Sequence, residues 1–358
     1  MYIVGMTGTG KSTLLLNMIK QDIENGEGVA VLDPHGDLVE TALQLVPEKR
    51  QKDVIYFNVP DANLRYSFNP LRNVPPKDRP LVASELIDIF KKIWDDFWGP
   101  RLEHILRNAL LALLDQPNAT LLDVLHILND REYRREVAMH LPNRAVREFW
   151  LREFEDYPLR FRAEAVSPIQ NKIGAFLSNP ILFRILTAKN NGLDLRSIMD
   201  EGKILLVNLS KGKIGEDTAS LLGAFLVSQL GRTALRRADS PESTRRDFYA
   251  YLDEFQSFST PSLVSMLSEL RKYRMNLILA HQFTSQLEVP VRDAILGNAG
   301  TIISFRVGLK DADIMARSFY PEFPEYHIIN LPNYSIYVKL MIEGVIGKAF
   351  SAETLLDM

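Results

Sequence analysis

Cysteine is absent from the 358-residue sequence, which therefore holds neither a disulfide framework nor a thiolate metal site. The six histidines are scattered, and none of them stand at the spacing of zinc ligands. No apolar run approaches the roughly 20 residues that a membrane-spanning helix needs, and the N-terminus shows no secretory signal pattern. These absences favour a reducing compartment and a cytoplasmic protein.

An excess of basic residues is also absent. The net charge is -3 and the pI is about 6.1, so the whole-chain charge gives no sign of nucleic-acid binding. This argues against a protein that coats DNA. It does not argue against a motor, because a motor grips DNA through a few repeated phosphate contacts.

The sequence Gly5-Met-Thr-Gly-Thr-Gly-Lys-Ser12 matches the phosphate-binding pattern G-x-x-x-x-G-K-[ST] in full. A short apolar strand precedes it and an apolar helix follows, which is the context that the pattern requires. Glycines allow backbone N–H groups to surround the β-phosphate of a nucleotide at a helix N-terminus. Lys11 would bridge the β- and γ-phosphates of ATP, and Ser12 would bind Mg²⁺. The predicted nucleotide-binding residues are Gly5, Thr7, Gly8, Thr9, Gly10, Lys11, Ser12 and Thr13.

Only residues 1–4 are available to form the strand that precedes this loop. We therefore expect that the natural protein has an N-terminal region that this chain lacks. A membrane anchor in that region, or a partner, would place the protein at the inner face of the membrane.

Eight short apolar runs predict strands at residues 2–4, 28–33, 54–58, 203–208, 248–253, 276–280, 301–305 and 334–338. They are almost continuously apolar, as are strands that are buried on both faces of a parallel sheet. Between residues 73 and 200 the strand pattern disappears and apolar residues recur at helical spacing. We predict a nucleotide-binding α/β domain at 1–72 and 201–358, with an all-helical domain inserted at 73–200.

The run at 248–253 ends in two carboxylates, Asp253 and Glu254, which is the Walker B arrangement. Asp253 would hold the Mg²⁺ shell and Glu254 would polarise the attacking water, so the glutamate indicates hydrolysis rather than binding alone. The alternative is a strand that ends at a polar turn.

The run at 276–280 ends in His281 and Gln282. In a sheet of this kind the neighbouring strand delivers a sensor to the γ-phosphate, and we assign this role to Gln282. His281 is the competing candidate, and an amide with a purely structural role is the third possibility.

Three further groups have two readings each. Arg271 could reach the γ-phosphate bound by a neighbouring subunit as an arginine finger, or could only favour a helix C-terminus. Arg306 is a second finger candidate or a member of a structural ion pair. Asp33 and Asp37 could contact the Mg²⁺ shell or cap the following helix. The arginine-rich segment 131–164 carries nearly as many acidic residues, which favours a solvated helical surface.

The whole set of motifs resembles the HerA/FtsK superfamily of ring ATPases, and within it the conjugative coupling ATPases of type IV secretion, of the TraG/TraD kind. The motifs occur in one order and include Asp33-Pro-His-Gly-Asp37 and Asn69-Pro-Leu71. The resemblance implies a RecA-like domain with a mostly parallel sheet flanked by helices, an all-α domain, and a homo-hexamer around DNA. It also implies Lys11, Glu254, Arg271 and Gln282 as catalytic residues and Ser12 with Asp253 as the Mg²⁺ site. The family's usual N-terminal anchor and the lysine that many relatives have at His35 are absent here.

The leading hypothesis is a DNA-stimulated ATPase that translocates DNA into a transfer channel, with relaxase or channel proteins as partners. The first alternative is a soluble HerA-like motor that works with a nuclease. The second is a nucleotide-dependent scaffold without translocation, against which Glu254 argues.

Overall fold

The computed structural model describes residues 1–94, 98–188, 192–342 and 344–355. The chain divides into two compact units, a sheet unit of Met1–Pro60 with Asp194–Met358 and a helical unit of Asp61–Leu193. These limits differ from the expected boundaries at 72/73 and 200/201. Ser67 bridges to Gly192 within the helical unit, whereas helix α11 (Leu195–Asp200) packs on α13 and β2 of the sheet unit.

The sheet unit is built on a nine-stranded sheet in the order β11-β8-β7-β1-β6-β5-β2-β4-β3. The seven strands from β7 to β3 pair in parallel, and β8 and β11 are joined to this edge by antiparallel pairing. The strands are β1 (Tyr2–Val4), β2 (Gly28–Asp33), β3 (Val54–Asn58), β4 (Ile204–Asn208), β5 (Phe248–Leu252), β6 (Met275–His281), β7 (Ile302–Ser304), β8 (Ser335–Lys339) and β11 (Phe350–Glu353). The prediction of a mostly parallel sheet is confirmed.

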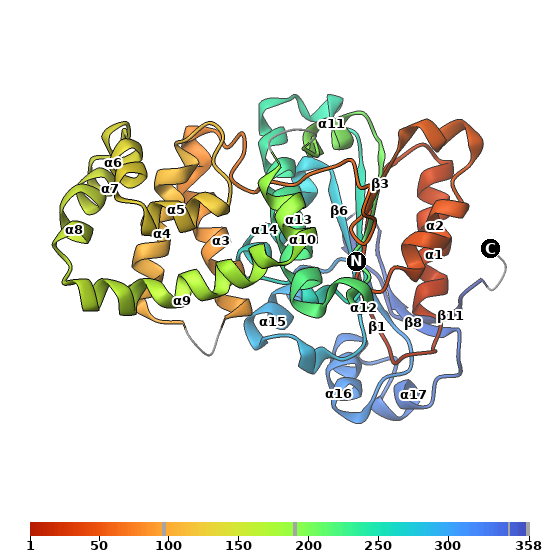
Figure 1. Cartoon of the computed structure of the whole chain (residues 1–358). Coiled ribbons are helices and arrows are strands. Elements are labelled where there is room, and N and C mark those ends of the chain that lie inside the picture. The colour runs from red at the N-terminus through yellow and green to blue at the C-terminus, as the bar shows by residue number, and fades with distance from the viewer. Residues whose placement is uncertain (95–97, 189–191, 343, 356–358) are drawn as a thin grey trace. The chain divides into compact units, whose positions relative to one another are not determined.

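Helices cover both faces of this sheet, with α1 and α2 on one face and α13 and α14 on the other (Figure 1). Residues of α1 and α2 share a buried apolar cluster with every second residue of β1 and β2. Strands β1, β2 and β4 are buried along their whole length, which explains their continuous apolar sequences. The helices of this unit are α1 (Lys11–Glu24), α2 (Asp37–Gln44), α11, α12 (Lys211–Ile214), α13 (Glu216–Arg236), α14 (Pro261–Leu267), α15 (Val289–Asn298), α16 (Leu309–Ser318) and α17 (Glu325–Ile329).

The strand order decides which loops meet. β6 lies between β1 and β5, and all three run in the same direction. The segments that follow these strands therefore emerge at one edge of the sheet, which we call the carboxyl edge. In parallel sheets this edge, near a point where the strand order reverses, is the usual place for a ligand.

All eight strands predicted from the apolar runs are present, three with the predicted bounds and five with one or both ends shifted by one residue. Three short strands were not predicted: β11 and the hairpin formed by β9 (Met341–Ile342) and β10 (Val345–Ile346). These strands are half-buried or exposed along most of their length, so they lack the apolar runs by which buried strands are found.

The helical unit contains α3 (Arg79–Ile93), α4 (Pro100–Leu114), α5 (Leu122–Asn129), α6 (Arg131–Met139), α7 (Arg144–Glu148), α8 (Phe154–Asp156), α9 (Leu159–Ser178) and α10 (Pro180–Thr187). A π-helical turn, Phe149–Glu153, connects α7 to α8. α4 packs against α3, α5 and α9, so the apolar face that the sequence shows along α4 forms the centre of this unit. Within the described part of the chain, no helix has the length and hydropathy to cross a bilayer.

Candidate functional site

The predicted phosphate-binding loop, residues 5–10, connects β1 to α1 at the carboxyl edge. Gly8 and Gly10 have φ angles of 77° and 112°, in the left-handed region that favours glycine. Gly5 is required for a different reason, because a Cβ atom there would lie 2.5 Å from the Cβ of Phe305. Phe305 directly follows β7 and is fully buried. The loop therefore depends on glycine for backbone conformation at two positions and for close packing at a third.

The hydroxyl groups of the loop differ in their exposure. Thr9 is buried, and its hydroxyl donates to the carbonyl of Met6 at 2.7 Å. Thr7 and Ser12 are exposed, and Thr13 is half-buried. Helix α1 begins without a side-chain cap and has no acidic residue in its first turn. Its free N–H groups therefore favour an anion at this end, next to the Ser12 hydroxyl.

Lys11 lies beneath the loop and is only 8% exposed. Its ammonium group donates to the carbonyls of Gly5 at 2.5 Å and Met6 at 3.1 Å. Burial lowers the pKa of Lys11, and the nearby carboxylates of Asp253 and Glu254 oppose this shift. The cation is thus held by two neutral acceptors, from which it can turn toward a phosphate.

Asp253 and Glu254 follow β5 at the same edge and are both buried. Burial raises the pKa of Asp253 to about 7, and the charges of Asp33 and Glu254 add to the rise. Glu254 has φ 46° and ψ 46°, a left-handed conformation that is costly for a residue with a side chain. Such strain at the end of a strand is typical of functional positions.

Gln282 connects the loop to Glu254. Its amide oxygen accepts from the hydroxyl of Thr7 at 2.9 Å, and its amide nitrogen donates to Oε1 of Glu254 at 2.5 Å. The other carboxylate oxygen, Oε2, accepts from the amide of Gln256 at 2.6 Å. Gln282 therefore lies between the phosphate-binding loop and the carboxylate of Glu254. Gln256 was not singled out from the sequence, in which a polar residue two positions after Asp253-Glu254 carries no distinctive signal.

His281 and Asp33 have structural partners. His281 is fully buried, its Nε2 lies 2.6 Å from the Tyr2 hydroxyl, and burial lowers its pKa to about 4. The carboxylate of Asp33 accepts backbone N–H groups of His35, Leu38 and Val39 at the start of α2. The contacts of Asp33 are therefore those of a helix-capping residue, one of the two roles expected for it. Its negative charge also raises the pKa of Asp253. Asp37 is exposed.

Arg306 and Tyr334 support the loop from the next strands. The guanidinium of Arg306 donates to the carbonyl of Leu331 and to Oδ1 of Asn333, so its partners are neutral oxygens rather than the carboxylate of the expected ion pair. The backbone N–H of Tyr334 donates to the carbonyl of Thr9 at 2.8 Å. Tyr334 was not found from the sequence, because it is distant along the chain and belongs to no motif.

Arg271 lies away from this cluster. It belongs to the 3₁₀ turn η8 (Leu270–Tyr273), which directly precedes β6. Because β6 and β1 are parallel, η8 stands at the amino edge of the sheet, opposite the phosphate-binding loop. The fold therefore does not bring Arg271 to the site of its own chain.

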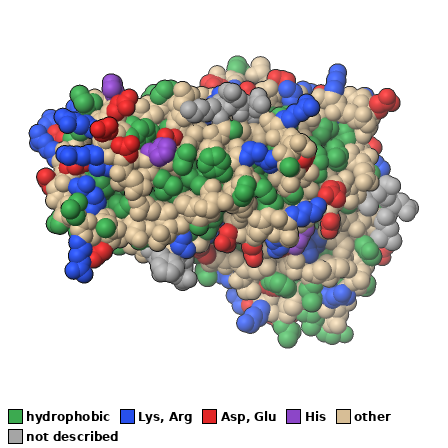
Figure 2. Space-filling view, viewed as in Figure 1, with side chains coloured by type: hydrophobic (Ala, Val, Ile, Leu, Met, Phe, Trp, Pro, Cys, Tyr) green, Lys and Arg blue, Asp and Glu red, His purple; other side chains and the backbone are tan. Residues whose placement is uncertain are grey.

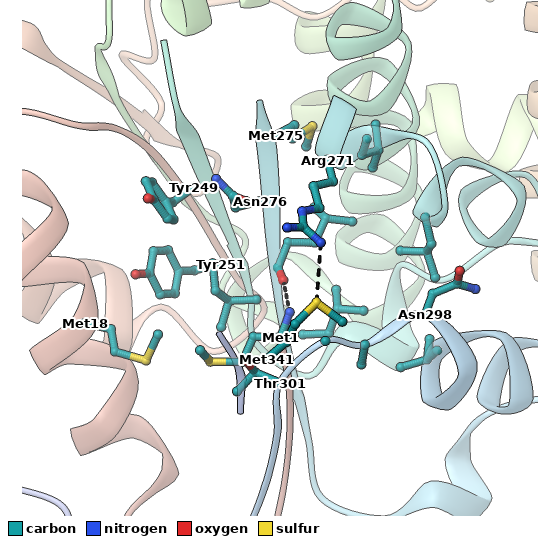
Figure 3. Close-up of a pocket in the computed structure, with 18 of the residues that line it drawn as sticks. Met1, Met18, Tyr249, Tyr251, Arg271, Met275, Asn276, Asn298, Thr301 and Met341 are labelled. Carbon is teal, nitrogen blue, oxygen red and sulfur yellow. Dashed lines mark hydrogen bonds between the residues drawn. The ribbon is translucent and has the colours of Figure 1, made fainter. Parts of the chain in front are cut away.

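A pocket of about 430 Å³ surrounds Arg271 at the amino edge. Figure 3 shows the guanidinium extending toward Met341 and Met1, with Asn276 and Asn298 elsewhere in the lining. The side chain of Arg271 is exposed, and its hydrogen-bond partner is the sulfur of Met341 at 3.4 Å. Within the described ranges of the chain no carboxylate lies within ion-pair distance of this arginine, which leaves its charge available to another group.

The arginine-rich segment of the helical unit is paired internally. Arg134 is buried against Glu155 and over the ring of Phe154, and Arg144 pairs with Glu148 on the surface. Figure 2 shows basic and acidic side chains interspersed at this end of the unit, around α6 to α8. The pair of Arg144 and Glu148 fits the expected solvated surface, whereas Arg134 is buried inside the unit.

The described residues contain no group of three or more His, Cys, Asp or Glu side chains that could hold a metal ion. The oxygen donors expected to bind Mg²⁺ at the carboxyl edge are the exposed hydroxyl of Ser12 and the carboxylate of Asp253. Two protein oxygens with phosphates and waters make up the usual Mg²⁺ shell in nucleotide sites, so this donor set fits Mg²⁺ bound together with a nucleotide.

The comparisons with known proteins agree with this arrangement. A family model described as the type IV secretion-system coupling protein DNA-binding domain matches residues 1–313. The plasmid coupling protein TrwB, solved with the non-hydrolysable ATP analogue ADPNP, has a TM-score of 0.71 at 17% identity over 100% of this chain and 85% of that chain. TrwB with ADP and Mg²⁺ has a TM-score of 0.69 at 17% identity, over the same shares of the two chains. VirB4 of Thermoanaerobacter pseudethanolicus has a TM-score of 0.62 at 15% identity over 98% of this chain and 89% of that chain. At these identities the structures show the common fold. No curated protein matches the sequence.

Proposed function

The chain belongs to the family of type IV secretion-system coupling protein DNA-binding domains, and on this basis we propose that it is an ATP-hydrolysing DNA translocase of a conjugative or type IV secretion-like DNA-transfer system. The observation that carries the proposal is the Thr7–Gln282–Glu254 chain of hydrogen bonds, which links the phosphate-binding loop to the base for the attacking water. The nucleotides bound in the TrwB structures support ATP with Mg²⁺ as the ligands.

Each residue of the carboxyl edge has a role in this proposal. The loop N–H groups and Lys11 bind the phosphates, and Ser12 with Asp253 holds Mg²⁺, which neutralises phosphate charge when it is bound. Glu254 accepts a proton from the attacking water, a contribution of roughly 10²–10⁴ in rate for a general base. Gln282 contacts the γ-phosphate and reports its presence to Glu254.

Arg271 completes the site of a neighbouring copy. It stands at the amino edge, remote along the strands from its own loop, and it carries a charge that no carboxylate of the described residues neutralises. A ring of copies, which we propose to be a hexamer with DNA in its lumen, would place this arginine against the next nucleotide. Relaxase or channel components are the proposed protein partners of this ring.

The first experiment is ATP hydrolysis measured with single- and double-stranded DNA, together with the oligomeric mass. We expect DNA to stimulate turnover in the assembled form. Glu254→Gln should lower kcat by about a hundredfold or more and should retain ATP binding and assembly. Undiminished hydrolysis in Glu254→Gln would rule out the assigned base, and hydrolysis stimulated only by a nuclease partner would favour the HerA-like motor instead.

The second experiment tests the neighbour's contribution by mixing inactive variants. Lys11→Ala removes the side chain that binds the phosphates, and Arg271→Ala removes the arginine finger. Loss of an arginine finger lowers the rate by roughly 10³–10⁵ where it has been measured. Mixed rings contain interfaces that pair an intact loop with an intact arginine, so the mixture should regain activity. Arg274→Ala is the matched control, because Arg274 pairs with Asp247 in its own chain. This variant should hydrolyse ATP at the wild-type rate. Failure to regain activity at every mixing ratio would count against Arg271.

A further inference from the structure

Both oxygens of the Glu254 carboxylate are engaged by amide groups. Gln282 donates to Oε1 at 2.5 Å and Gln256 donates to Oε2 at 2.6 Å. A carboxylate only accepts hydrogen bonds, so each glutamine must present its N–H₂ group to it. Each oxygen still has a second acceptor site, so the two amides do not block the base but restrict the direction from which a water can reach it.

The two glutamines differ in what holds them. Gln282 follows β6, a separate strand, and its amide oxygen is tied to Thr7 of the phosphate-binding loop. Gln256 belongs to the 3₁₀ turn η7 (Phe255–Ser257), which begins directly after Glu254. A phosphate that binds at the loop can therefore disturb the hydrogen bond between Gln282 and Glu254. The hydrogen bond between Gln256 and Glu254 lies within one turn and is retained when that turn shifts.

The backbone alone does not secure Glu254. Its left-handed conformation is unfavourable for a residue with a side chain, so neighbouring contacts must maintain it. The bond to Gln256 spans only two residues and closes a small ring with the strained backbone. This contact fixes the direction of the carboxylate relative to β5.

We infer that Gln256 is a positioning residue for the base Glu254, and this inference rests on the proposed function. Gln282 leaves Oε1 when the γ-phosphate is bound, while Gln256 keeps Oε2 and aims Oε1 at the water. The water oxygen then bonds to the γ-phosphorus and the β–γ bridging P–O bond breaks with its electrons on ADP. The water's proton passes to Oε1, so atoms and charge balance.

The test compares three variants of the full chain. Gln256→Met keeps the length of the side chain and removes the N–H donor, and Gln256→Glu replaces the donor with a second carboxylate that repels Glu254. Ser257→Ala is the matched control, because Ser257 lies in the same turn, whereas the amides that bind the Glu254 carboxylate come from Gln256 and Gln282. Measurements are kcat and KM for ATP, the Kd of a fluorescent ATP analogue, and the thermal midpoint.

We expect kcat to fall about tenfold in Gln256→Met, as part of the general-base contribution, and further in Gln256→Glu. KM, Kd and the thermal midpoint should remain close to the wild-type values, as they should in Ser257→Ala. A purely structural role would instead lower the midpoint and weaken ATP binding together with kcat, which overturns the inference. Unchanged or increased kcat in Gln256→Met overturns it as well.

The same data separate this inference from the proposed function. Wild-type protein without ATPase activity, or a Glu254→Gln variant as active as wild type, removes the proposed function itself. Normal hydrolysis that depends on Glu254 but not on Gln256 removes only the positioning role.

Discussion

Gly5→Ala tests the packing beneath the phosphate-binding loop. The added Cβ would lie 2.5 Å from the Cβ of Phe305 and 3.1 Å from the hydroxyl oxygen of Thr9. The first contact involves an atom fixed to the backbone of a buried residue, so no side-chain rotation relieves it. The loop or the segment after β7 must shift instead.

The expected cost follows from this geometry. Extra methyl groups in well-packed regions destabilise by about 1–3 kcal/mol, and each kcal/mol lowers the melting temperature by about 2–4 °C for a unit of this size. Gly297→Ala is the control, and we expect it to stabilise the protein rather than destabilise it. Gly297 lies in α15, its added Cβ meets no atom within 4 Å, and alanine in a helix is favoured over glycine by up to about 1 kcal/mol.

The assay is thermal unfolding followed by circular dichroism, with binding of a fluorescent ATP analogue as a second measurement. Gly5→Ala should melt several degrees below wild type and bind the analogue more weakly, whereas Gly297→Ala should melt at or above wild type. Adding Phe305→Leu to Gly5→Ala should not restore binding, because leucine retains the obstructing Cβ. Wild-type melting in Gly5→Ala, or rescue by Phe305→Leu, would refute the reasoning.

Two further predictions concern buried charges. The pKa of Asp253 is raised to about 7 in the fold, so this group favours folding below about pH 4 and loses that contribution as the pH rises to 7. Asp253→Asn should therefore raise the melting temperature of Mg²⁺-free protein at pH 8 and change it little at pH 4; equal shifts at both values would contradict the pKa. Arg237 is fully buried and donates to Asp200 and to the carbonyls of Tyr273 and Arg246. Arg237→Met should cost about 3 kcal/mol of unfolding free energy in urea titrations, and a cost under about 0.5 kcal/mol would show that water satisfies these groups.

The strands were predictable where burial is complete. A strand such as β2 is covered on both faces, so its whole sequence is apolar and stands out between polar turns. β11 pairs only with β8, at the sheet's edge, and its side chains are mostly exposed. No comparable pattern marks such a strand, and its identity depends on the partner it pairs with.

The assignment of Arg271 illustrates a second limit. The sequence left open a finger for a neighbouring subunit or a helix C-terminal residue, and the family resemblance implied the finger. The direction of β6 shows that Arg271 stands at the opposite edge of the sheet from the loop of its own chain. Arg306 shows the converse case. It lies next to the loop, but its guanidinium is bound to Leu331 and Asn333.

The sequence by itself determined the chemistry that depends on local order. The phosphate-binding loop and the Asp253-Glu254 pair are contiguous, because each must present its groups from one turn of the chain. The tertiary structure alone decided which distant groups meet them. It placed β6 between β1 and β5, brought Gln282 to the carboxylate of Glu254, and packed Phe305 against Gly5. These contacts arise from strand order and close packing, which join residues that no local pattern connects.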